Sequence, residues 1–226
     1  MPNRTIAHSI TPKDALQLLR EGNFRFVNNL AINHDMLELV NATKDDQWPF
    51  AAILSCMDSR TAAEVVFNLG LGDIFSVRIG GNVISPNVLG SLEYAVAVAG
   101  SKLILVLGHT GCGAVRGACD NVKLGHITTL LEHIHPAVEE ESTIKENRNG
   151  SNPGFVNAVA RINVRNTVQE MIRESSIIRD MAAKGEIGIV PAMYDVATGL
   201  VTFFEDEALL KVATANHDAA KDVLPK

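Results

Sequence analysis

The stretch LILVLGHTGCG at residues 103–113 decides the fold, because it joins a run of five aliphatic residues to a glycine-rich polar turn. Such a short, continuous run is typical of a strand that is buried on both faces by covering helices. The stretch FAAILSCMDSR at residues 50–60 likewise passes from an apolar run into polar residues. Ligands of open parallel sheets bind beyond the carboxyl ends of the strands, so we expect a functional site at these two strand ends.

Helical patterns alternate with short apolar runs from residue 50 onward. Ser85-Pro86 supplies a capped helix start, and Gly70 and Gly100 are placed to end helices. The expected strands are Phe50–Ser55, Ile74–Ile79 and Leu103–Leu107, and the expected helices between them are Ala62–Leu69 and Asn87–Ala99. Strands separated by helices imply right-handed crossovers and parallel pairing. The sequence therefore predicts an α/β fold with a mostly parallel central sheet flanked by helices.

The second half of the chain is expected to contain two helices and an edge hairpin. The helices are Ile127–Glu141 and Phe155–Ala183, and the second has an apolar side made of Val159, Ile162, Val168, Met171 and Ile172. Strands Ile187–Tyr194 and Leu200–Phe204 flank the turn Asp195–Gly199, which predicts an antiparallel pair at one edge of the sheet. A charged helix is expected over residues 205–226.

The first 46 residues are expected to form an N-terminal helical arm. Thr11-Pro12 followed by Asp14 is a helix start, with a capping hydroxyl, a proline at the first helical position and a carboxylate in the first turn. The apolar positions of this helix are Leu16, Leu19, Phe26 and Val27, and Val27 is its expected end. The polar segment 28–47 separates them from the next apolar run. We therefore expect the arm to pack on a partner chain.

The length of 226 residues favours one domain. We expect a single domain over residues 1–226, made of the arm 1–46, an α/β core 47–204 and the C-terminal helix 205–226. A chain of this length buries roughly 70% of the surface of its unfolded form. It needs no disulfide or metal merely to fold, so any metal that it binds is expected to be functional.

Charge and hydropathy exclude two classes of partner. The chain carries 20 basic and 26 acidic residues, a formal net charge of -6, and has no basic block that would neutralise a nucleic-acid backbone. Its apolar runs fall far short of the roughly 20 residues of a membrane helix. The N-terminus has no continuous signal-peptide core, and three cysteines do not suggest a secreted disulfide framework. We therefore expect no nucleic acid, no membrane and a cytoplasmic location.

Cys56, His109 and Cys112 together offer two thiolates and one imidazole, a donor set suited to Zn²⁺ with one tetrahedral position left over. Structural zinc sites usually take four protein ligands from tight local pairs, whereas Cys56 precedes His109 by 53 residues. Three protein ligands and one open position favour a catalytic zinc site. Glycines at positions 108, 111 and 113 allow the sharp turns that such a site needs.

Asp58 and Arg60 follow Cys56 closely enough for their side chains to pair beside the metal. The pair would hold Asp58 ionised, so that it accepts a hydrogen bond from metal-bound water and orients the resulting hydroxide. Each residue also has a plainer interpretation: Cys56 as a small buried hydrophobe, Arg60 as a surface charge and His109 as the partner of a backbone carbonyl. Their joint occurrence at two strand ends favours the metal site. Cys119 has no such neighbours and is expected in the core.

The pattern C-x-D-x-R at residues 56–60, with H-x-x-C at residues 109–112, resembles the signature of the β-class carbonic anhydrases. The resemblance is specific over about residues 47–117 and covers most of the chain more loosely. It implies an α/β domain that dimerises and the reversible hydration of CO₂ to bicarbonate and a proton by zinc-bound hydroxide. The residues that it assigns are Cys56, His109 and Cys112 as ligands of one Zn²⁺ per chain, and Asp58 and Arg60 as the catalytic dyad.

The same resemblance implies a substrate pocket that is completed by a neighbouring subunit. Gln47, Phe75 and Tyr94 match positions that line the pocket in plant-like members, and Gly113 is expected to join them in binding substrate. The expected partners are CO₂ or bicarbonate and further copies of the chain, in a homodimer or a tetramer. Gly80 stands where plant enzymes commonly have a larger aliphatic residue, which bears on the width of the pocket.

Further family features bear on this chain. In some members the catalytic aspartate swings onto zinc, in a form linked to a bicarbonate site that includes a tryptophan, and Ile53 occupies that position here. The open form is therefore expected, and Arg78 is expected to be structural. Hydrolysis of CS₂ or carbonyl sulfide on the same zinc site is the alternative activity. His126, His133 and His135 have two open interpretations, as proton shuttles or as plain exposed helix residues.

Overall fold

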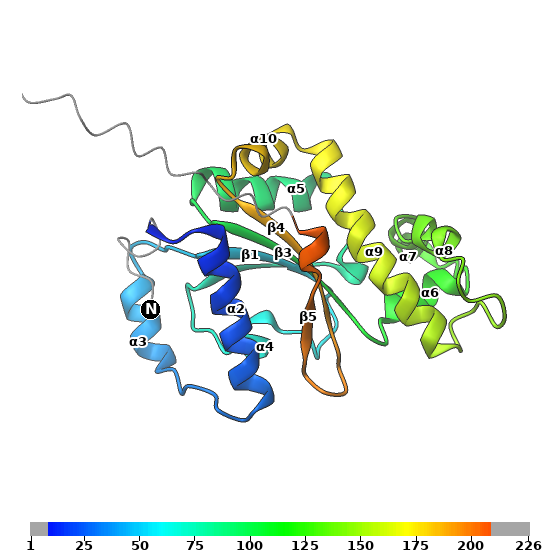
Figure 1. Ribbon diagram of the computed structural model, residues 1–226, viewed down its shortest axis with the longest axis horizontal. Helices are drawn as coiled ribbons and strands as arrows, with labels where there is room; N and C mark the ends of the chain where they lie inside the picture. The colour runs from blue at the N-terminus through cyan, green and yellow to red at the C-terminus, as the bar shows by residue number, and fades with distance from the viewer. Residues whose placement is uncertain (1–8, 209–226) are drawn as a thin grey trace, which may run out of the picture.

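The computed structural model describes residues 9–208, which form a five-stranded sheet with helices on both faces (Figure 1). The strands are β1 Ala51–Ser55, β2 Ile74–Arg78, β3 Leu103–His109, β4 Gly188–Tyr194 and β5 Val201–Phe203, in the spatial order β2-β1-β3-β4-β5. The first four strands are parallel, and β5 is antiparallel to β4 at one edge. The predicted α/β fold with its edge hairpin is therefore confirmed.

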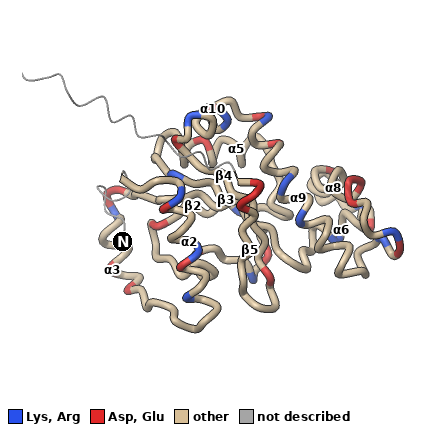
Figure 2. The backbone as a smooth tube through the Cα atoms, viewed as in Figure 1, with Lys and Arg blue, Asp and Glu red and all other residues tan. Residues whose placement is uncertain are grey.

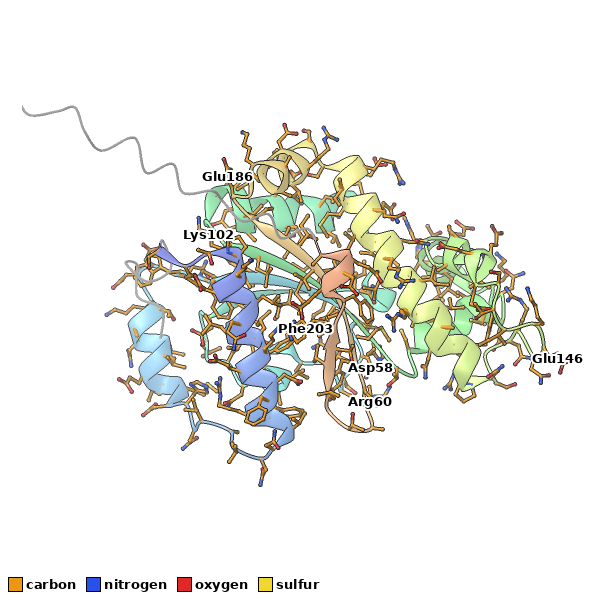
Figure 3. All side chains as sticks on the ribbon, viewed as in Figure 1. Asp58, Arg60, Lys102, Glu146, Glu186 and Phe203 are labelled. Atoms are coloured by element: carbon orange, nitrogen blue, oxygen red, sulfur yellow. The ribbon has the colours of Figure 1, made fainter. Side chains whose placement is uncertain are left out.

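The register of the parallel strands brings their carboxyl ends to one edge of the sheet. Ser55, the last residue of β1, lies opposite Leu107 of β3. The turns that follow β1 and β3 therefore leave the sheet side by side. Figure 3 shows Asp58 and Arg60 at this edge, at the opposite end of the sheet from Lys102, which precedes β3.

One face of the sheet is covered by α2 Pro12–Val27 and the short helix α4 Ala63–Val66. Their apolar side chains pack on strand residues that point to this face, among them Ile53, Leu105 and Val190. Because successive side chains of a strand alternate between the faces, the residues between them supply the opposite core.

Helix α2 packs on its own chain, so the expectation that the arm packs on a partner was wrong for its main apolar positions. Leu16 and Leu19 are buried against the sheet, with 4% and 0% of their surface exposed. Asn23 anchors the same helix, since its side-chain amide donates to the carbonyl of Val66 at 3.1 Å and to that of Gly199 at 2.9 Å. The arm is therefore an integral part of the core.

The segment 28–47, read from the sequence as polar, contains a further helix, α3 Met36–Thr43. Asp35 caps the start of this helix by accepting a hydrogen bond from the backbone N–H of Glu38 at 3.0 Å. Of its apolar residues, Leu39 is buried, whereas the rest are exposed. The helix start predicted at Thr11 is confirmed, and the structure shows that Thr11 and Asp14 form a capping box there.

The other face of the sheet is covered by α5 Pro86–Glu93, the π-helical turn η2 Tyr94–Val98, α9 Pro153–Glu174 and α10 Ser176–Lys184. The single helix expected over Phe155–Ala183 is thus two helices that meet at Ser175. The Ser175 hydroxyl donates to the carboxylate of Glu93 at 2.6 Å and accepts from the backbone N–H of Ile178 at 3.1 Å. This cap ends one helix and starts the next.

Beyond the carboxyl edge of the sheet, three short helices lie against α9 (Figure 1). They are α6 Gly113–Cys119, α7 Gly125–Glu132 and α8 His135–Glu140. The single helix expected over Ile127–Glu141 is broken before Pro136, because proline lacks an N–H and takes a place in the first turn of α8. The buried cluster of this layer includes Cys56 and Cys112, and Cys119 packs at its margin.

Two 3₁₀ turns complete the described elements, η1 Gly80–Asn82 and η3 Glu205–Glu207. The charged helix expected over residues 205–226 is a 3₁₀ turn where it is described, and its residues 209–226 lie outside the described part. Within residues 9–208, no helix has both the length and the apolar character that crossing a bilayer requires. Figure 2 shows acidic and basic residues interspersed along the chain.

Truncation of Leu19 should destabilise the protein, because the side chain joins α2 to the sheet. Leu19→Ala is expected to lower the free energy of unfolding by about 2–5 kcal/mol. Leu18→Ala, on the exposed side of the same helix, is the control and should change the free energy of unfolding by about 0.5 kcal/mol or less. Urea denaturation followed by circular dichroism measures both, and equal effects of the two substitutions would contradict the packing of α2.

Candidate metal centre

Three elements bring Cys56, His109 and Cys112 together. Cys56 follows β1, His109 ends β3, and Cys112 precedes α6 as its N-terminal cap residue. All three side chains are buried, and their potential ligand atoms lie within 4.8 Å of one another. The two strand ends that were expected to share one site therefore meet in the fold.

The donor atoms fit a zinc ion. Tetrahedral Zn²⁺ with Zn–S bonds of about 2.3 Å separates two thiolate sulfurs by about 3.8 Å. The Sγ atoms of Cys56 and Cys112 are 3.9 Å apart. His109 Nδ1 lies 3.0 Å from the carbonyl oxygen of Thr110, to which it donates when it carries the proton. His109 Nε2 is buried and has no hydrogen-bond partner among the described residues, so its lone pair is left for a metal.

The two buried thiols hold their protons very differently. The hydrogen bond from Cys112 lowers the pKa of the Cys56 thiol to about 4, against the effect of burial and with further help from the N–H of Gly81. Hydrogen bonding to Cys56, together with burial, raises the pKa of Cys112. A bound metal ion would displace the protons of both thiols, because the thiolate is the form of cysteine that binds a metal.

Asp58 and Arg60 form a two-pronged ion pair beside the cluster (Figure 3). Arg60 Nε donates to Asp58 Oδ1 at 2.9 Å, and Nη2 donates to Oδ2 at 2.8 Å. These bonds hold the pKa of Asp58 well below its usual range, so the carboxylate is ionised at neutral pH. The Thr61 hydroxyl bonds to the carbonyl oxygens of Cys56 and Asp58. Arg78, expected to be structural, donates to the same two carbonyl oxygens and so fixes the turn from β2.

An apolar cavity of about 660 Å³ opens at the cluster, where Cys56, Asp58 and Gly113 line it. The apolar residues of its wall include Met57, Ala114, Ile127, Leu130 and Leu131. Gly80 also lines the cavity, and a Cβ at this position would lie 3.2 Å from Leu130 Cδ2, so glycine keeps this part of the cavity open. His126 lines the same cavity, whereas His133 is exposed at the end of α7.

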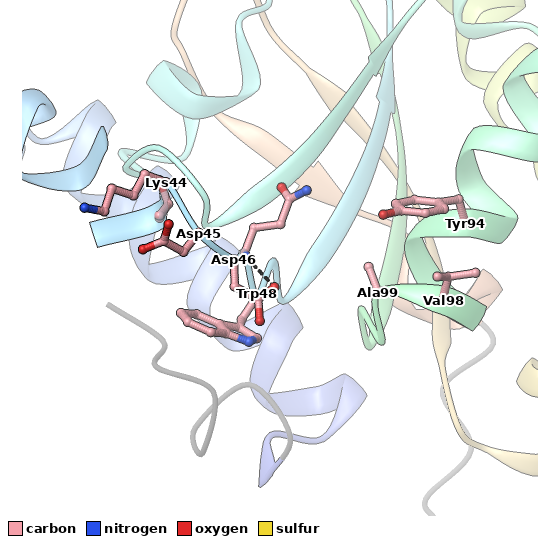
Figure 4. Close-up of a pocket in the computed structure, with 9 residues that line it drawn as sticks. Lys44, Asp45, Asp46, Trp48, Tyr94, Val98 and Ala99 are labelled. Carbon is pink, nitrogen blue, oxygen red and sulfur yellow. Dashed lines mark hydrogen bonds between the residues drawn. The ribbon is translucent and has the colours of Figure 1, made fainter. Parts of the chain in front are cut away.

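Gln47, Phe75 and Tyr94 do not meet the cluster within one chain. Phe75 lies opposite Ala52 near the start of β1, whereas Cys56 follows the end of that strand. Gln47 and Tyr94 line a separate polar cavity of about 450 Å³ (Figure 4). The rings of Phe75 and Tyr94 stack edge to face with their centroids 6.1 Å apart. The structure thus splits the expected substrate residues, with Gly113 at the cluster and the other three away from it.

Two asparagines of α9 that the sequence pattern does not single out contact the turns of the cluster. Asn157 Oδ1 accepts from the backbone N–H of Gly111 at 2.9 Å, and Asn163 Nδ2 donates to the carbonyl of Gly81 at 2.8 Å. Asn163 is buried among the apolar residues of the helix. A polar residue within an apolar helix face is the available signal, because a buried amide needs a partner.

Comparison with known proteins agrees with this geometry. The carbonic anhydrase family model matches residues 51–201. Carbonic anhydrase 2 of Mycobacterium tuberculosis is 36% identical over 199 residues, which cover 83% of this chain and 90% of that protein. The carbonic anhydrase of Mycolicibacterium smegmatis is 35% identical over 196 residues, which cover 84% of this chain and 92% of that protein.

Solved structures share the fold at lower identity. A tetrameric β-carbonic anhydrase of the filamentous ascomycete Sordaria macrospora has a TM-score of 0.66 at 22% identity, with 85% of this chain and 98% of that chain covered. The β-carbonic anhydrase of Coccomyxa has a TM-score of 0.67 at 23% identity, with 84% and 86% covered. The family match over most of the sequence and the two bacterial relatives together show that the chain belongs to the carbonic anhydrase family, and its fold is that of the β-carbonic anhydrases.

Proposed function

We propose that the chain catalyses the zinc-dependent, reversible hydration of CO₂ to bicarbonate and a proton at the cluster of Cys56, His109 and Cys112. The family to which the chain belongs carries out carbonic anhydrase chemistry, a lyase reaction. The observation that carries the finer assignment is the buried, unpartnered Nε2 of His109, in a cluster with two sulfurs and beside the ionised carboxylate of Asp58.

Each residue of the site has a separate task. Cys56, His109 and Cys112 would hold one Zn²⁺ per chain and leave a fourth position open. A bound Zn²⁺ lowers the pKa of water and supplies hydroxide as a nucleophile near neutral pH. Asp58 accepts a hydrogen bond from the reacting water and so directs the lone pair of the water oxygen toward the carbon of CO₂. Arg60 holds this carboxylate in place, and the apolar wall of the cavity receives the neutral substrate.

The ion pair also supports the open form of the site. Asp58 places both carboxylate oxygens on Arg60 and none on the cluster. Ile53, at the position where other family members have a tryptophan, is fully buried in β1 and has no hydrogen-bonding side chain. The contact that accompanies the closed form in those members therefore has no counterpart at this position.

We further propose that a second copy of the chain completes the substrate pocket, in a homodimer or a tetramer. Gln47, Phe75 and Tyr94 lie away from the cluster of their own chain, so they are free to line the pocket of a neighbour. Exposed apolar residues of the segment 24–40 suit such a contact, and they are Phe24, Leu30, Ile32, Met36, Leu37 and Val40. The Sordaria enzyme with the same fold is described as tetrameric.

Two proposals concern the setting of the reaction and its substrate. The three cysteines form no disulfide, which supports the reducing, cytoplasmic location expected from the sequence. Hydrolysis of CS₂ or carbonyl sulfide would use the same donor set and is the alternative activity. Turnover of CO₂ measured beside turnover of CS₂ distinguishes them, and we expect CO₂ to be preferred.

Removal of any one proposed ligand should release the metal. Cys56→Ala, His109→Ala and Cys112→Ala are each expected to lose most bound zinc and CO₂ hydration, because two protein ligands hold Zn²⁺ weakly. Cys119→Ala is the control, since this cysteine lies outside the cluster and its loss should leave one zinc per chain. Metal analysis after dialysis and stopped-flow CO₂ hydration measure the two quantities. Full zinc in all three ligand variants would refute the assignment.

Asp58→Asn keeps the size of the side chain but removes its charge. Turnover should fall by at least about tenfold while zinc stays bound, because an amide orients the reacting water less well than a carboxylate. Stopped-flow rates with metal content measured in parallel check this expectation. Arg165→Ala is the control, because Arg165 forms a similar two-pronged ion pair with Glu207 outside the cavity. This substitution should leave turnover unchanged.

Arg60→Ala should free the Asp58 carboxylate to compete for the open metal position. Activity is therefore expected to be lowest at mildly acidic pH and to recover as the pH rises, because hydroxide competes for that position better than water does. The pH profile of CO₂ hydration measures this recovery. A rate equal to the parent rate at every pH, with zinc fully bound, would show that the dyad has no catalytic role.

A further inference from the structure

Helix α9 contacts both halves of the metal cluster. The first half is Cys56, in the turn after β1. The second half is His109, at the end of β3 and 53 residues later in the sequence, together with Cys112 in the turn that follows. Each half is hydrogen-bonded to a different asparagine of the same 22-residue helix. Helix α9, as well as the sheet, therefore connects ligands that are far apart in the sequence.

On the first half, the backbone of Gly81 stands between α9 and Cys56. The Gly81 N–H donates to Cys56 Sγ at 3.4 Å, and the Gly81 carbonyl accepts from Asn163 Nδ2 at 2.8 Å. Gly81 has a φ of 66°, and a Cβ there would lie 2.6 Å from Ile134 Cδ1, so the position requires glycine. Asn163 is only 2% exposed, so its amide is committed to this contact.

On the second half, Gly111 lies in the turn between His109 and Cys112, with a φ of 65°. Its N–H donates to Asn157 Oδ1 at 2.9 Å. The hydrogen bond ties the backbone between these two ligands to α9. Both glycine turns are thus fixed to one helix, through Asn157 on one side and Asn163 on the other.

We propose that Asn157 and Asn163 are positioning residues, which hold the two halves of the cluster at ligand distance and keep the Gly81 N–H directed at the Cys56 sulfur. The proposal rests on the proposed function only in taking the cluster as a metal site. A plain packing role does not explain the residue type at Asn163, because burying an amide costs free energy that its hydrogen bonds only offset, and an apolar residue would avoid that cost.

The two asparagines have different chemical consequences. An N–H bonded to a thiolate withdraws negative charge from the sulfur, so Asn163 tunes electron donation by Cys56 as well as its position. Asn157 bonds to a turn whose N–H is not directed at a sulfur, so it acts on position alone. The two effects are separable by measurement.

The experiment compares the zinc affinity of nearly isosteric variants of the full-length chain. Asn163→Leu and Asn157→Leu remove the hydrogen bonds but keep the size of the side chain. Each is expected to weaken zinc binding by about 10-fold to 100-fold, the usual effect of losing a hydrogen-bond partner that stands behind a metal ligand. Competition with a chelator of known zinc affinity at neutral pH measures the dissociation constant. Thermal unfolding of the metal-free protein measures stability separately.

Thr167→Val is the matched control. Thr167 is also buried on α9, and its hydroxyl donates to the carbonyl of Asn82, next to Gly81, at 3.3 Å. The substitution removes a comparable bond from the same turn but leaves Gly81 and Gly111 held, so the zinc affinity should match that of the parent.

Cobalt substitution adds an electronic readout. The thiolate-to-metal absorption band should move to lower energy in Asn163→Leu, because the Cys56 sulfur regains negative charge when the N–H is no longer held against it. The band should stay in place in Asn157→Leu. A merely structural role would move it in neither variant.

Zinc affinity equal to that of the parent in both asparagine variants would overturn the proposal. A loss that Thr167→Val shows to the same degree, in proportion to lost thermal stability, would also overturn it. If Asn163→Leu does not fold, the half-buried Asn157 still decides, since unchanged affinity in Asn157→Leu contradicts the proposal. If the parent chain itself does not bind zinc, the proposed function fails as well. If the parent binds zinc and both asparagine variants bind it equally well, only the present proposal fails.

Discussion

Ser55 of β1 lies opposite Leu107 of β3, and the rest of the site is built on this pairing. Both strands are covered by helices on their two faces, with separate buried clusters above and below the sheet. A slip of one residue would turn every side chain of a strand to the opposite face, so hydrophobic packing specifies the register strongly. The positions of Cys56 and His109 therefore depend first on the apolar core, and hydrogen bonds to the neighbouring turns fix them further.

The turn after β1 gathers several functions within five residues. Cys56 supplies a sulfur, and Asp58 and Arg60 supply the ion pair. Thr61 and Arg78 both donate to the carbonyl oxygens of this turn, so the proposed metal ligand and the carboxylate are fixed as one unit. The apolar cavity next to it provides the setting in which an ionised carboxylate acts strongly, since few polar groups compete for its hydrogen bonds.

The strands and the three donor residues were predictable because each carries its own local signal, an aliphatic run or a distinctive donor chemistry. The break before Pro136 had a signal in the sequence, the proline itself, which the expected helix ran through. The break at Ser175 was harder to predict, because a pattern of apolar residues with helical period can continue across it. The amphipathic face of α2 was recognised, but an apolar face does not say which surface covers it. Leu16 and Leu19 in fact pack on their own sheet.

Other parts of the site depend on tertiary structure alone. Asn157 and Asn163 contact turns that lie far from α9 in the sequence and next to it only in the fold. The sequence around the helix therefore does not indicate these contacts. The separation of Phe75 from Cys56 follows from strand register. Alignment of the chain with a family motif names such residues, but only the fold shows that Phe75 lies beside the start of β1 whereas Cys56 follows its end.

The 53-residue separation of Cys56 and His109 in the sequence also links the stability of the fold to the proposed metal ion. In the unfolded chain, Cys56 can join His109 and Cys112 only by closing a long loop, which costs conformational entropy. In the native state the pairing of β1 with β3 has already closed this loop. An ion that binds only the folded form stabilises it by mass action, by about 2.7 kcal/mol when the free ion is at 100 times its dissociation constant. If the chain binds zinc as proposed, zinc depletion would therefore lower its free energy of unfolding together with its activity.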